Sequence, residues 1–207
     1  EMLGLAMMSA YRGIPIAHIE GGDLSGVVDN KVRHAITHLS DFHFCTNDES
    51  YKRLLAMGVS VRNVWNYGTL DVDCDATMRG IMEQPRTRPY VLVAYHPLPG
   101  ENHKEVTKAI YGIETKIVGS NSDYGKQYGE ESYSPEEYIS LMKHARCCVG
   151  NSSSFLKEAS ILGVPVVNVG SRQDKRLKPA NVLDVPCEAK IIRDAIAFQS
   201  GRTFAAD

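Results

Sequence analysis

Glu20, Asp29 and Arg33 are the residues in the first part of the chain whose types and spacing suit proton-transfer chemistry. The apolar run Ile14–Ile19 predicts a short buried strand that ends at Glu20 and the glycine pair Gly21–Gly22. Open α/β sheets bind ligands at the carboxyl ends of their strands. Asp29 and Arg33 lie four residues apart, so they share one face at the start of the next helix. Two acids could therefore converge on one small molecule; alternatively, Asp29 only starts the helix and Glu20 is a solvated loop acid.

A histidine and a serine-rich loop follow two later apolar runs. His96 comes at the end of the run Tyr90–Tyr95. Histidine titrates near neutral pH, so it can exchange a proton with an oxygen atom or pair with a phosphate group, although a strand-end histidine can equally be structural. The loop Asn151-Ser152-Ser153-Ser154 opens a predicted helix over Ser153–Leu162, whose free N–H groups and hydroxyls suit a diphosphate. The alternative for these serines is ordinary helix capping.

Predicted strands and helices alternate along the whole chain, which is typical of parallel α/β sheets with crossover helices. Besides the strand Ile14–Ile19, strands are predicted at Phe42–Cys45, Val64–Tyr67, Tyr90–Ala94, Lys116–Gly119, Cys147–Val149 and Val164–Val169. Besides the helix Ser153–Leu162, helices are predicted at Leu3–Tyr11, Asp29–Leu39, Asp48–Met57, Lys104–Tyr111, Pro135–His144 and Ala189–Phe198. The segment Pro85–Pro89 has the composition of a linker. We therefore expect two domains, residues 1–84 and residues 85–207.

Three blocks of the sequence resemble the UDP-N-acetylglucosamine 2-epimerases, specifically the hydrolysing branch that makes N-acetylmannosamine and UDP. The blocks are HIEGGDLSG followed by DNKVRHAIT, the strand end VLVAYHP, and the segments VGNSSS and GVPVVNVGSRQ. The resemblance implies two Rossmann-like domains of glycosyltransferase-B type, facing each other across a cleft. It also implies that the first domain is incomplete in this chain, because the family's first strands and a cleft aspartate precede the position of Glu1. The segment Ser122–Tyr133 is short for the family.

The resemblance also assigns roles to residues. It implies that Glu20 and Asp29 are proton-transfer groups, that Arg33 orients Asp29 or meets a substrate oxygen, and that His96 is catalytic. It places the nucleotide on Asn151, Ser152, Ser153 and Ser154, where Ser154 replaces the family's usual glycine. Glu158 would accept hydrogen bonds from the ribose hydroxyls. Arg172 and Arg176 would either neutralise phosphate charge or be solvated loop residues.

The implied reaction removes the C2 proton while UDP leaves from C1, and then adds water at C1 and a proton at C2. It requires no metal and no other cofactor. A diacetamido-trideoxy sugar linked to UDP or GDP is an alternative substrate. Two further alternatives are a nucleotide-sugar-binding homologue without turnover and a glycosyltransferase of the same fold.

Composition narrows the remaining classes of function. With 23 Lys and Arg against 25 Asp and Glu, the net charge of −2 offers no electrostatic case for a nucleic-acid partner or an anionic membrane. No apolar run approaches the roughly 18 residues of a membrane span. The five cysteines show no CxxC pair, which favours free thiols in a reducing cytoplasm over disulfides or a zinc site. His34 and His38 lie one turn apart but lack an obvious third metal ligand. The resemblance adds the expectation of a homodimer that serves sialic acid synthesis.

Overall fold

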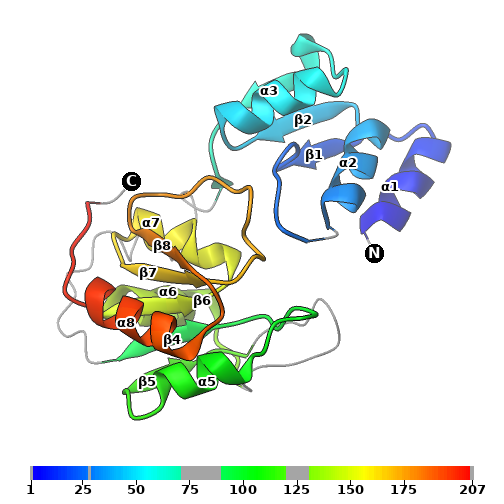
Figure 1. Ribbon diagram of the computed structural model, residues 1–207. Coiled ribbons are helices and arrows are strands. Elements are labelled where there is room, and N and C mark those ends of the chain that lie inside the picture. Colours follow the sequence, from blue (N-terminus) through cyan, green and yellow to red (C-terminus); the bar gives the residue numbers. More distant parts are fainter. Residues whose placement is uncertain (1, 28, 71–89, 120–130, 206–207) are drawn as a thin grey trace. The chain divides into compact units, whose positions relative to one another are not determined.

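The computed structural model describes residues 2–27, 29–70, 90–119 and 131–205, which form two compact units (Figure 1). The first unit holds residues 1–70 and 174–176, and the second holds residues 71–173 and 177–207. The predicted domain boundary between residues 84 and 85 and the predicted linker lie outside the described residues. The boundary therefore stays a prediction, as does the shortened segment at residues 122–133, most of which is also outside them.

The first unit is built on a parallel sheet with the strand order β1-β2-β3. Its strands are β1 (Ala17–Ile19), β2 (Phe42–Cys45) and β3 (Val64–Asn66), the last preceded by the 3-10 turn η1 (Val61–Asn63). Helix α1 (Met2–Tyr11) packs against α2 (Asp29–Leu39), and α3 (Asp48–Ala56) packs against β3 and β2. The side chain of Asn47 caps α3 by accepting a hydrogen bond from the Ser50 backbone N–H.

The prediction of a buried strand at Ile14–Ile19 was wrong in both length and burial. Only Ala17–Ile19 is a strand, and Ile14 and Ile19 are 51% and 54% exposed. The physical reason is the position of β1, which is the edge strand of the described sheet and pairs only with β2 there. A short core of Cys45, Leu54 and Val64 lies instead between β2, β3 and α3.

The second unit is a five-stranded parallel sheet with the order β5-β4-β6-β7-β8. Its strands are β4 (Val91–Ala94), β5 (Thr115–Ile117), β6 (Cys147–Gly150), β7 (Val166–Val169) and β8 (Val182–Val185). The helices among its described residues are α5 (Lys104–Ile110), α6 (Pro135–His144), α7 (Glu158–Ile161) and α8 (Ala189–Gln199). Ser134 and Glu137 form a capping box that starts α6.

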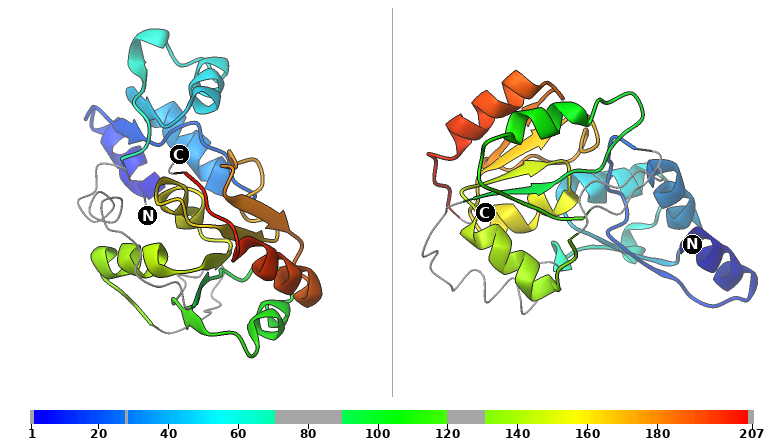
Figure 2. Two further views of the ribbon diagram at one scale, coloured as in Figure 1. Left: turned by 90° about the vertical axis from the view of Figure 1, so that its left-hand side faces the viewer. Right: turned by 90° about the horizontal axis from the view of Figure 1, so that it is seen from below.

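Helices cover both faces of this sheet (Figure 2). Along β4, Val91 and Val93 belong to the core shared with α5 and α8, whereas Leu92 and Ala94 belong to the core shared with α6 and α7. This period-two alternation between two apolar cores explains why the strands of the unit read as continuous apolar runs. Parallel α/β architecture is thus confirmed in both units.

Two further expectations need correction in the second unit. The predicted helix Ser153–Leu162 is divided into a 3-10 turn, η3 (Ser153–Phe155), and the short helix α7. The break falls at Lys157, which has φ of −100° and ψ of −78°. Before it, Ser152 Oγ and Ser154 Oγ lie 2.8 Å apart, a local contact of the kind by which serine hydroxyls compete with a regular helix. Strand β8 was not predicted, because its four residues between two prolines carry little pattern.

Within the described part of the chain, no helix is both long and apolar enough to span a membrane. Four of the cysteines, Cys45, Cys147, Cys148 and Cys187, are free thiols. Burial raises the pKa of Cys147 to about 12, so this thiol stays protonated at neutral pH.

Candidate functional site

Glu20 lies at the carboxyl end of β1 and has a left-handed backbone, with φ of 59°. Its N–H donates to the carbonyl of Phe44 on β2, with 2.8 Å between the two atoms. A cavity of about 200 Å³ opens at this edge of the sheet. It is lined by Ile19, Glu20, Phe44, Thr46, Tyr67, Gly68 and Leu70. The predicted acid therefore lies at the edge where the carboxyl ends of three parallel strands meet.

The loop after Glu20 is fixed by side chains that reach its backbone. Arg33 donates to the carbonyl of Asp23 at 2.9 Å and to Oδ1 of Asn30 at 3.2 Å. The amide of Asn30 in turn pairs with Ser25, accepting from its N–H at 2.8 Å and donating to its carbonyl at 2.6 Å. Asp29 is the exposed first residue of α2. Within the described residues, the hydrogen bonds of the Arg33 side chain therefore go to Asp23 of the loop and to Asn30, and not to Asp29.

Asp23 is a buried acid of the HIEGGDLSG block to which the sequence assigned no role. It is only 8% exposed, and its Oδ1 accepts hydrogen bonds from the hydroxyl of Ser50 at 2.6 Å and that of Thr46 at 3.2 Å. Arg53 adds a hydrogen bond to the carbonyl of Gly22. These contacts give Asp23 a structural role, because they tie the loop to the start of α3. Its proximity to Glu20 in the sequence is the signal that could have drawn attention to it.

In the second unit, three predicted site residues lie beyond the carboxyl ends of adjacent strands. His96 follows β4, Asn151 follows β6 and Arg172 follows β7, and these three strands are neighbours in the sheet. The approach of β6 to β4 depends on Gly150, which has φ of 142°. A Cβ at this position would lie 2.0 Å from the carbonyl oxygen of Ala94. Glycine therefore lets the two strand ends meet closely.

Asn151 is the centre of the contacts at this edge. Its side chain accepts a hydrogen bond from the His96 N–H at 2.7 Å and donates one to the His96 carbonyl at 2.9 Å. Its own carbonyl accepts from Arg172 Nη1 at 3.1 Å and from Gln173 Nε2 at 2.7 Å. Asn151 is fully buried, and Gln173, which belongs to the segment GVPVVNVGSRQ but received no role of its own from the sequence, is 2% exposed. The structure thus brings His96, Asn151 and Arg172 together.

The hydroxyls of the serine loop bond among themselves and to a tyrosine. Ser152 Oγ lies 2.8 Å from Ser154 Oγ, which lies 2.6 Å from the hydroxyl of Tyr138. Burial raises the pKa of Tyr138, so this hydroxyl remains protonated and can donate to Ser154. Ser153 begins the 3-10 turn, and Glu158 is the first residue of α7. The loop therefore presents a 3-10 turn, in place of the expected α-helix start.

Glu101 joins the loop after β4 to the loop after β7, and the sequence reasoning missed it. Its Oε2 accepts from the buried hydroxyl of Tyr95 at 2.7 Å, and its Oε1 accepts from the Ser171 N–H at 3.0 Å. Burial, followed by the hydrogen bond to Glu101, raises the pKa of Tyr95, which keeps this donor protonated. The two loops that carry His96 and Arg172 are therefore connected a second time.

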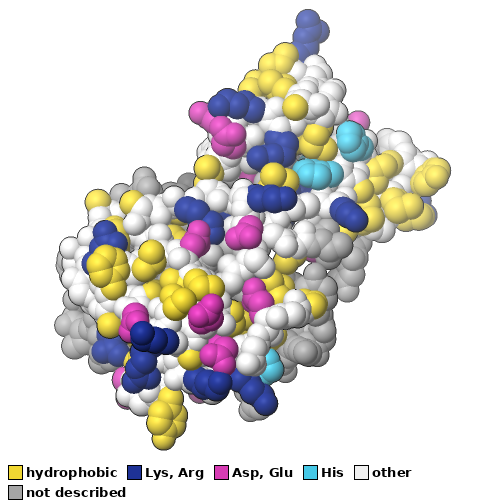
Figure 3. All heavy atoms as spheres, viewed as in Figure 1, with side chains coloured by type: hydrophobic (Ala, Val, Ile, Leu, Met, Phe, Trp, Pro, Cys, Tyr) yellow, Lys and Arg dark blue, Asp and Glu magenta, His cyan; other side chains and the backbone are white. Residues whose placement is uncertain are grey.

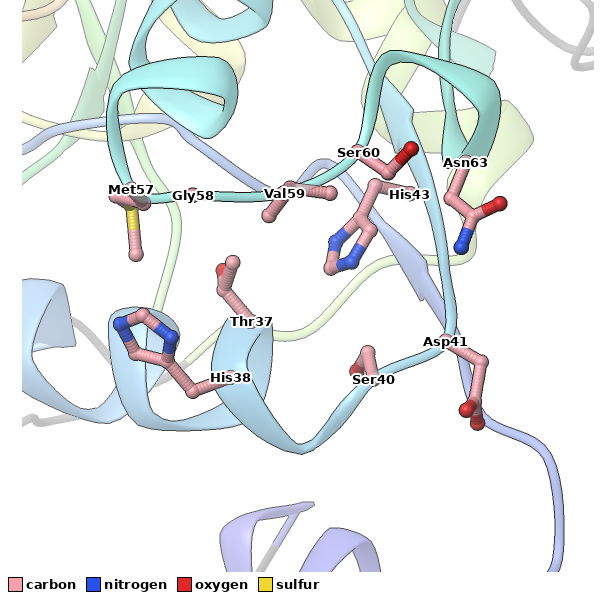
Figure 4. Close-up of a pocket in the computed structure, with 10 residues that line it drawn as sticks. All are labelled: Thr37, His38, Ser40, Asp41, His43, Met57, Gly58, Val59, Ser60 and Asn63. Carbon is pink, nitrogen blue, oxygen red and sulfur yellow. The ribbon is translucent and has the colours of Figure 1, made fainter.

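A second pocket of the first unit, of about 260 Å³, lies near the amino ends of β2 and β3 (Figure 4). It contains none of the predicted site residues; Thr37, His38, Asp41, His43, Ser60 and Asn63 supply most of its polar lining. The ring of His43 points into it, and desolvation lowers the pKa of this histidine. No group of three or more His, Cys, Asp or Glu side chains suited to a metal ion occurs among the described residues.

Sequence comparison relates the chain to a family of nucleotide-sugar epimerases. The family model described as UDP-N-acetylglucosamine 2-epimerase matches residues 1–203. The chain is 31% identical over 225 residues to UDP-N-acetylglucosamine 2-epimerase of Neisseria meningitidis, covering 95% of this chain and 60% of the relative. It is 31% identical over 216 residues to the hydrolysing UDP-N,N'-diacetylbacillosamine 2-epimerase of Legionella pneumophila, covering 89% of this chain and 57% of that protein. The chain thus spans less than two thirds of the length of these relatives.

Solved structures resemble the chain in fold. The UDP-GlcNAc 2-epimerase of Methanocaldococcus jannaschii, in complex with UDP-GlcNAc and UDP, aligns with a TM-score of 0.76 at 17% identity, covering 99% of this chain and 68% of that one. The Neisseria meningitidis enzyme bound to UDP-GlcNAc aligns with a TM-score of 0.71 at 15% identity, over the same shares of the two chains. The likeness confirms the predicted fold class, α/β with Rossmann-like domains of glycosyltransferase-B type.

Proposed function

Because the chain belongs to the UDP-N-acetylglucosamine 2-epimerase family, we propose that the protein is a hydrolysing nucleotide-sugar 2-epimerase that converts UDP-N-acetylglucosamine and water into N-acetylmannosamine and UDP. The observation that carries the proposal is the match of the family model over residues 1–203. It is supported by Glu20 at the carboxyl edge of one sheet and by the His96, Asn151 and Arg172 cluster at the carboxyl edge of the other. Such edges are where α/β proteins bind nucleotides.

The first step is an elimination. A carboxylate of the first unit removes the C2 proton as the bond between C1 and the diphosphate oxygen breaks, which leaves 2-acetamidoglucal and UDP. We assign this proton transfer to the pair Glu20 and Asp29. The negative charge that develops on the leaving diphosphate needs hydrogen-bond donors and positive charge nearby. His96, the Ser152–Ser154 loop and Arg172 supply these groups in our proposal, and Glu158 holds the ribose hydroxyls.

The second step is a hydration. Water adds its hydroxyl at C1 of the glycal and a proton returns to C2 on the opposite face of the ring. The sugar is then released as N-acetylmannosamine, and UDP is the second product. Protons enter and leave through side chains of ordinary acid–base chemistry, so this scheme calls for no redox cofactor.

A diacetamido-trideoxy sugar is the second candidate substrate. The specific observation in its favour is that the Legionella relative is as similar to this chain as the Neisseria one, and it is named for hydrolysing UDP-N,N'-diacetylbacillosamine. A relative from Campylobacter jejuni, 28% identical, carries a GDP/UDP-N,N'-diacetylbacillosamine name. We place UDP-N-acetylglucosamine first because the family model carries its name.

We further propose a homodimer formed through the first unit. Apolar side chains gather on the face of the molecule that carries α1 (Figure 3). Met2, Leu5, Met8 and Tyr11 of this helix are between 53% and 87% exposed. Exposed apolar patches of this kind are typical of interaction surfaces. Light scattering coupled to size-exclusion chromatography tests the proposal, and a monomeric mass for the protein from its complete gene would overturn it.

Product analysis by NMR in deuterated water tests the reaction. Incubation of the protein from its complete gene with UDP-N-acetylglucosamine is expected to yield UDP and free N-acetylmannosamine that carries deuterium at C2. Turnover of UDP-N,N'-diacetylbacillosamine alone would select the second substrate. Binding of both nucleotide sugars without turnover of either would instead indicate a non-catalytic homologue.

A further inference from the structure

The side-chain amide of Asn151 meets the backbone of His96 on both sides of the same Cα. The N–H of His96 donates to Asn151 Oδ1 at 2.7 Å, and the carbonyl of His96 accepts from Asn151 Nδ2 at 2.9 Å. A pair of hydrogen bonds that flanks one Cα restrains both φ and ψ of that residue. Because Pro97 follows, His96 is already confined to extended conformations. Within that extended range, the two hydrogen bonds from Asn151 fix the backbone of His96 and so the direction in which its imidazole leaves the chain.

Asn151 is itself held in place. It is fully buried, and its backbone N–H donates to the carbonyl of Ala94 at 3.1 Å. Its carbonyl accepts from Arg172 and Gln173, both from the loop after β7. The absence of a Cβ at Gly150 permits this close approach, since a Cβ there would lie 2.0 Å from Ala94 O. The Asn151 amide is thus a rigid support with both of its hydrogen-bonding ends engaged by protein.

We propose that Asn151 is a positioning residue that aims His96 at the reacting diphosphate, rather than a residue that contacts the nucleotide. The inference rests on the proposed function, because it takes His96 as a group of that reaction. It differs from the sequence-based expectation, in which Asn151 was grouped with the serines as a nucleotide ligand. A residue that acts only through His96 should lose its effect when His96 is removed.

A double-mutant cycle between Asn151→Asp and His96→Gln tests this directly. Asp keeps the acceptor for the His96 N–H but removes the donor to the His96 carbonyl. In the enzyme from the complete gene, we expect Asn151→Asp alone to lower kcat by about 100-fold, the scale of loss that a misplacement of 1 Å can cause. Added to His96→Gln, it should change neither kcat nor the Kd of UDP further. Multiplying effects in the double variant, on kcat or on the Kd measured by calorimetry, would overturn the proposal.

Asn181→Asp is the matched control, because Asn181 is also buried and its amide donates to a backbone carbonyl, that of Val164, at 2.7 Å. It should lower the Tm without the kcat loss; an equal kcat loss would reduce Asn151 to a structural residue and overturn the proposal. If Asn151→Asp does not fold, Asn151→Ser removes the clamp without adding a charge and enters the same cycle.

The ring ¹⁵N signals of His96 give a readout that does not depend on turnover. They are assigned by their loss in His96→Gln, and they should shift in Asn151→Ser but not in Asn181→Asp. Unchanged His96 signals in Asn151→Ser would contradict the positioning role. If the wild-type protein turns over neither substrate, the proposed function fails. The ring signals still decide whether Asn151 sets the orientation of the His96 side chain.

Discussion

At the residue scale, Glu20 has a backbone conformation that its type does not favour. A left-handed φ of 59° costs a non-glycine residue roughly 1–2 kcal/mol, and glycine would adopt it freely. Gly21 and Gly22 follow directly, and a glycine at position 20 would adopt the same backbone without strain. The presence of a carboxylate at a strained position beside a cavity supports a role in chemistry.

Substitutions of Glu20 distinguish its role in catalysis from its effect on the stability of the protein. Glu20→Gln removes the proton-transfer group and should lower kcat by about 10²- to 10⁴-fold, the usual contribution of general acid–base catalysis. Glu20→Gly should lower kcat as much, without lowering the Tm, because it relieves the backbone. Asp194→Asn on the exposed surface of α8 is the control and should leave kcat unchanged. Retained activity in Glu20→Gln would remove Glu20 from the mechanism.

The half-buried histidine His18 makes the stability of the first unit depend on pH. Burial, the neighbouring His43 and then Arg33 lower the pKa of His18 from 6.5 to about 4. Between these two pH values the unfolded chain binds a proton at His18 that the folded protein does not bind. The free energy of unfolding should therefore fall as the pH drops from about 6.5 towards 4.

Urea unfolding at pH 7 and pH 5 measures this effect. His18→Asn is the comparison, because asparagine can replace the contact between His18 Nδ1 and the Thr37 hydroxyl, 3.2 Å apart, without titrating. We expect the variant to lose less stability than the wild type between the two pH values. An equal loss in both proteins would show that other groups cause the acid sensitivity.

At the scale of elements, a side-chain amide fixes the loop after a strand in both units. Asn30 pairs with the backbone of Ser25 as Asn151 pairs with that of His96, through one accepted and one donated hydrogen bond. In the second unit, Glu101 adds a connection between the loops after β4 and β7. Loops held in this way present their side chains in one arrangement, which lowers the entropy cost of binding a ligand.

Gly170 is the position at which the Glu101 connection can be broken. Gly170 has φ of 75°, and a Cβ there would lie 2.2 Å from Glu101 Oε1. Gly170→Ala should destabilise the protein by about 1–3 kcal/mol more than the control Gly100→Ala. Gly100 has a similar φ of 86°, but a Cβ there would meet no atom within 4 Å, so it carries the conformational cost alone. Equal losses of stability in chemical denaturation would show that the Glu101 contact contributes nothing.

At the scale of the whole molecule, the two units differ in how completely their sheets are covered. In the second unit, β4, β6 and β7 are buried along their whole lengths between two apolar cores. Among the described residues of the first unit, the buried apolar cluster at the sheet consists of Cys45, Leu54 and Val64. Since apolar burial is the main stabilising term, the second unit should be the more stable one.

Hydrogen–deuterium exchange of the intact protein tests this difference. The slowest amides should be those of β6 and β7, and the amides of β1 should exchange faster than both. Exchange measured with and without UDP adds a second comparison, in which protection should rise at the ends of β4 and β6. Slower exchange in β1 than in β6 would contradict the ranking.

The sequence by itself determined the alternation of strands and helices, the parallel α/β class and the positions of most candidate site residues. These features depend on local periodicity, on turn residues and on short motifs, which neighbouring residues carry on their own. The tertiary structure decided the exposure of β1, the division of the predicted helix Ser153–Leu162, and the partners of Arg33, Asn151 and Glu101. Each of those depends on contacts between residues far apart in the chain, such as Asn151 with His96, and no local pattern encodes which backbone a buried amide will meet.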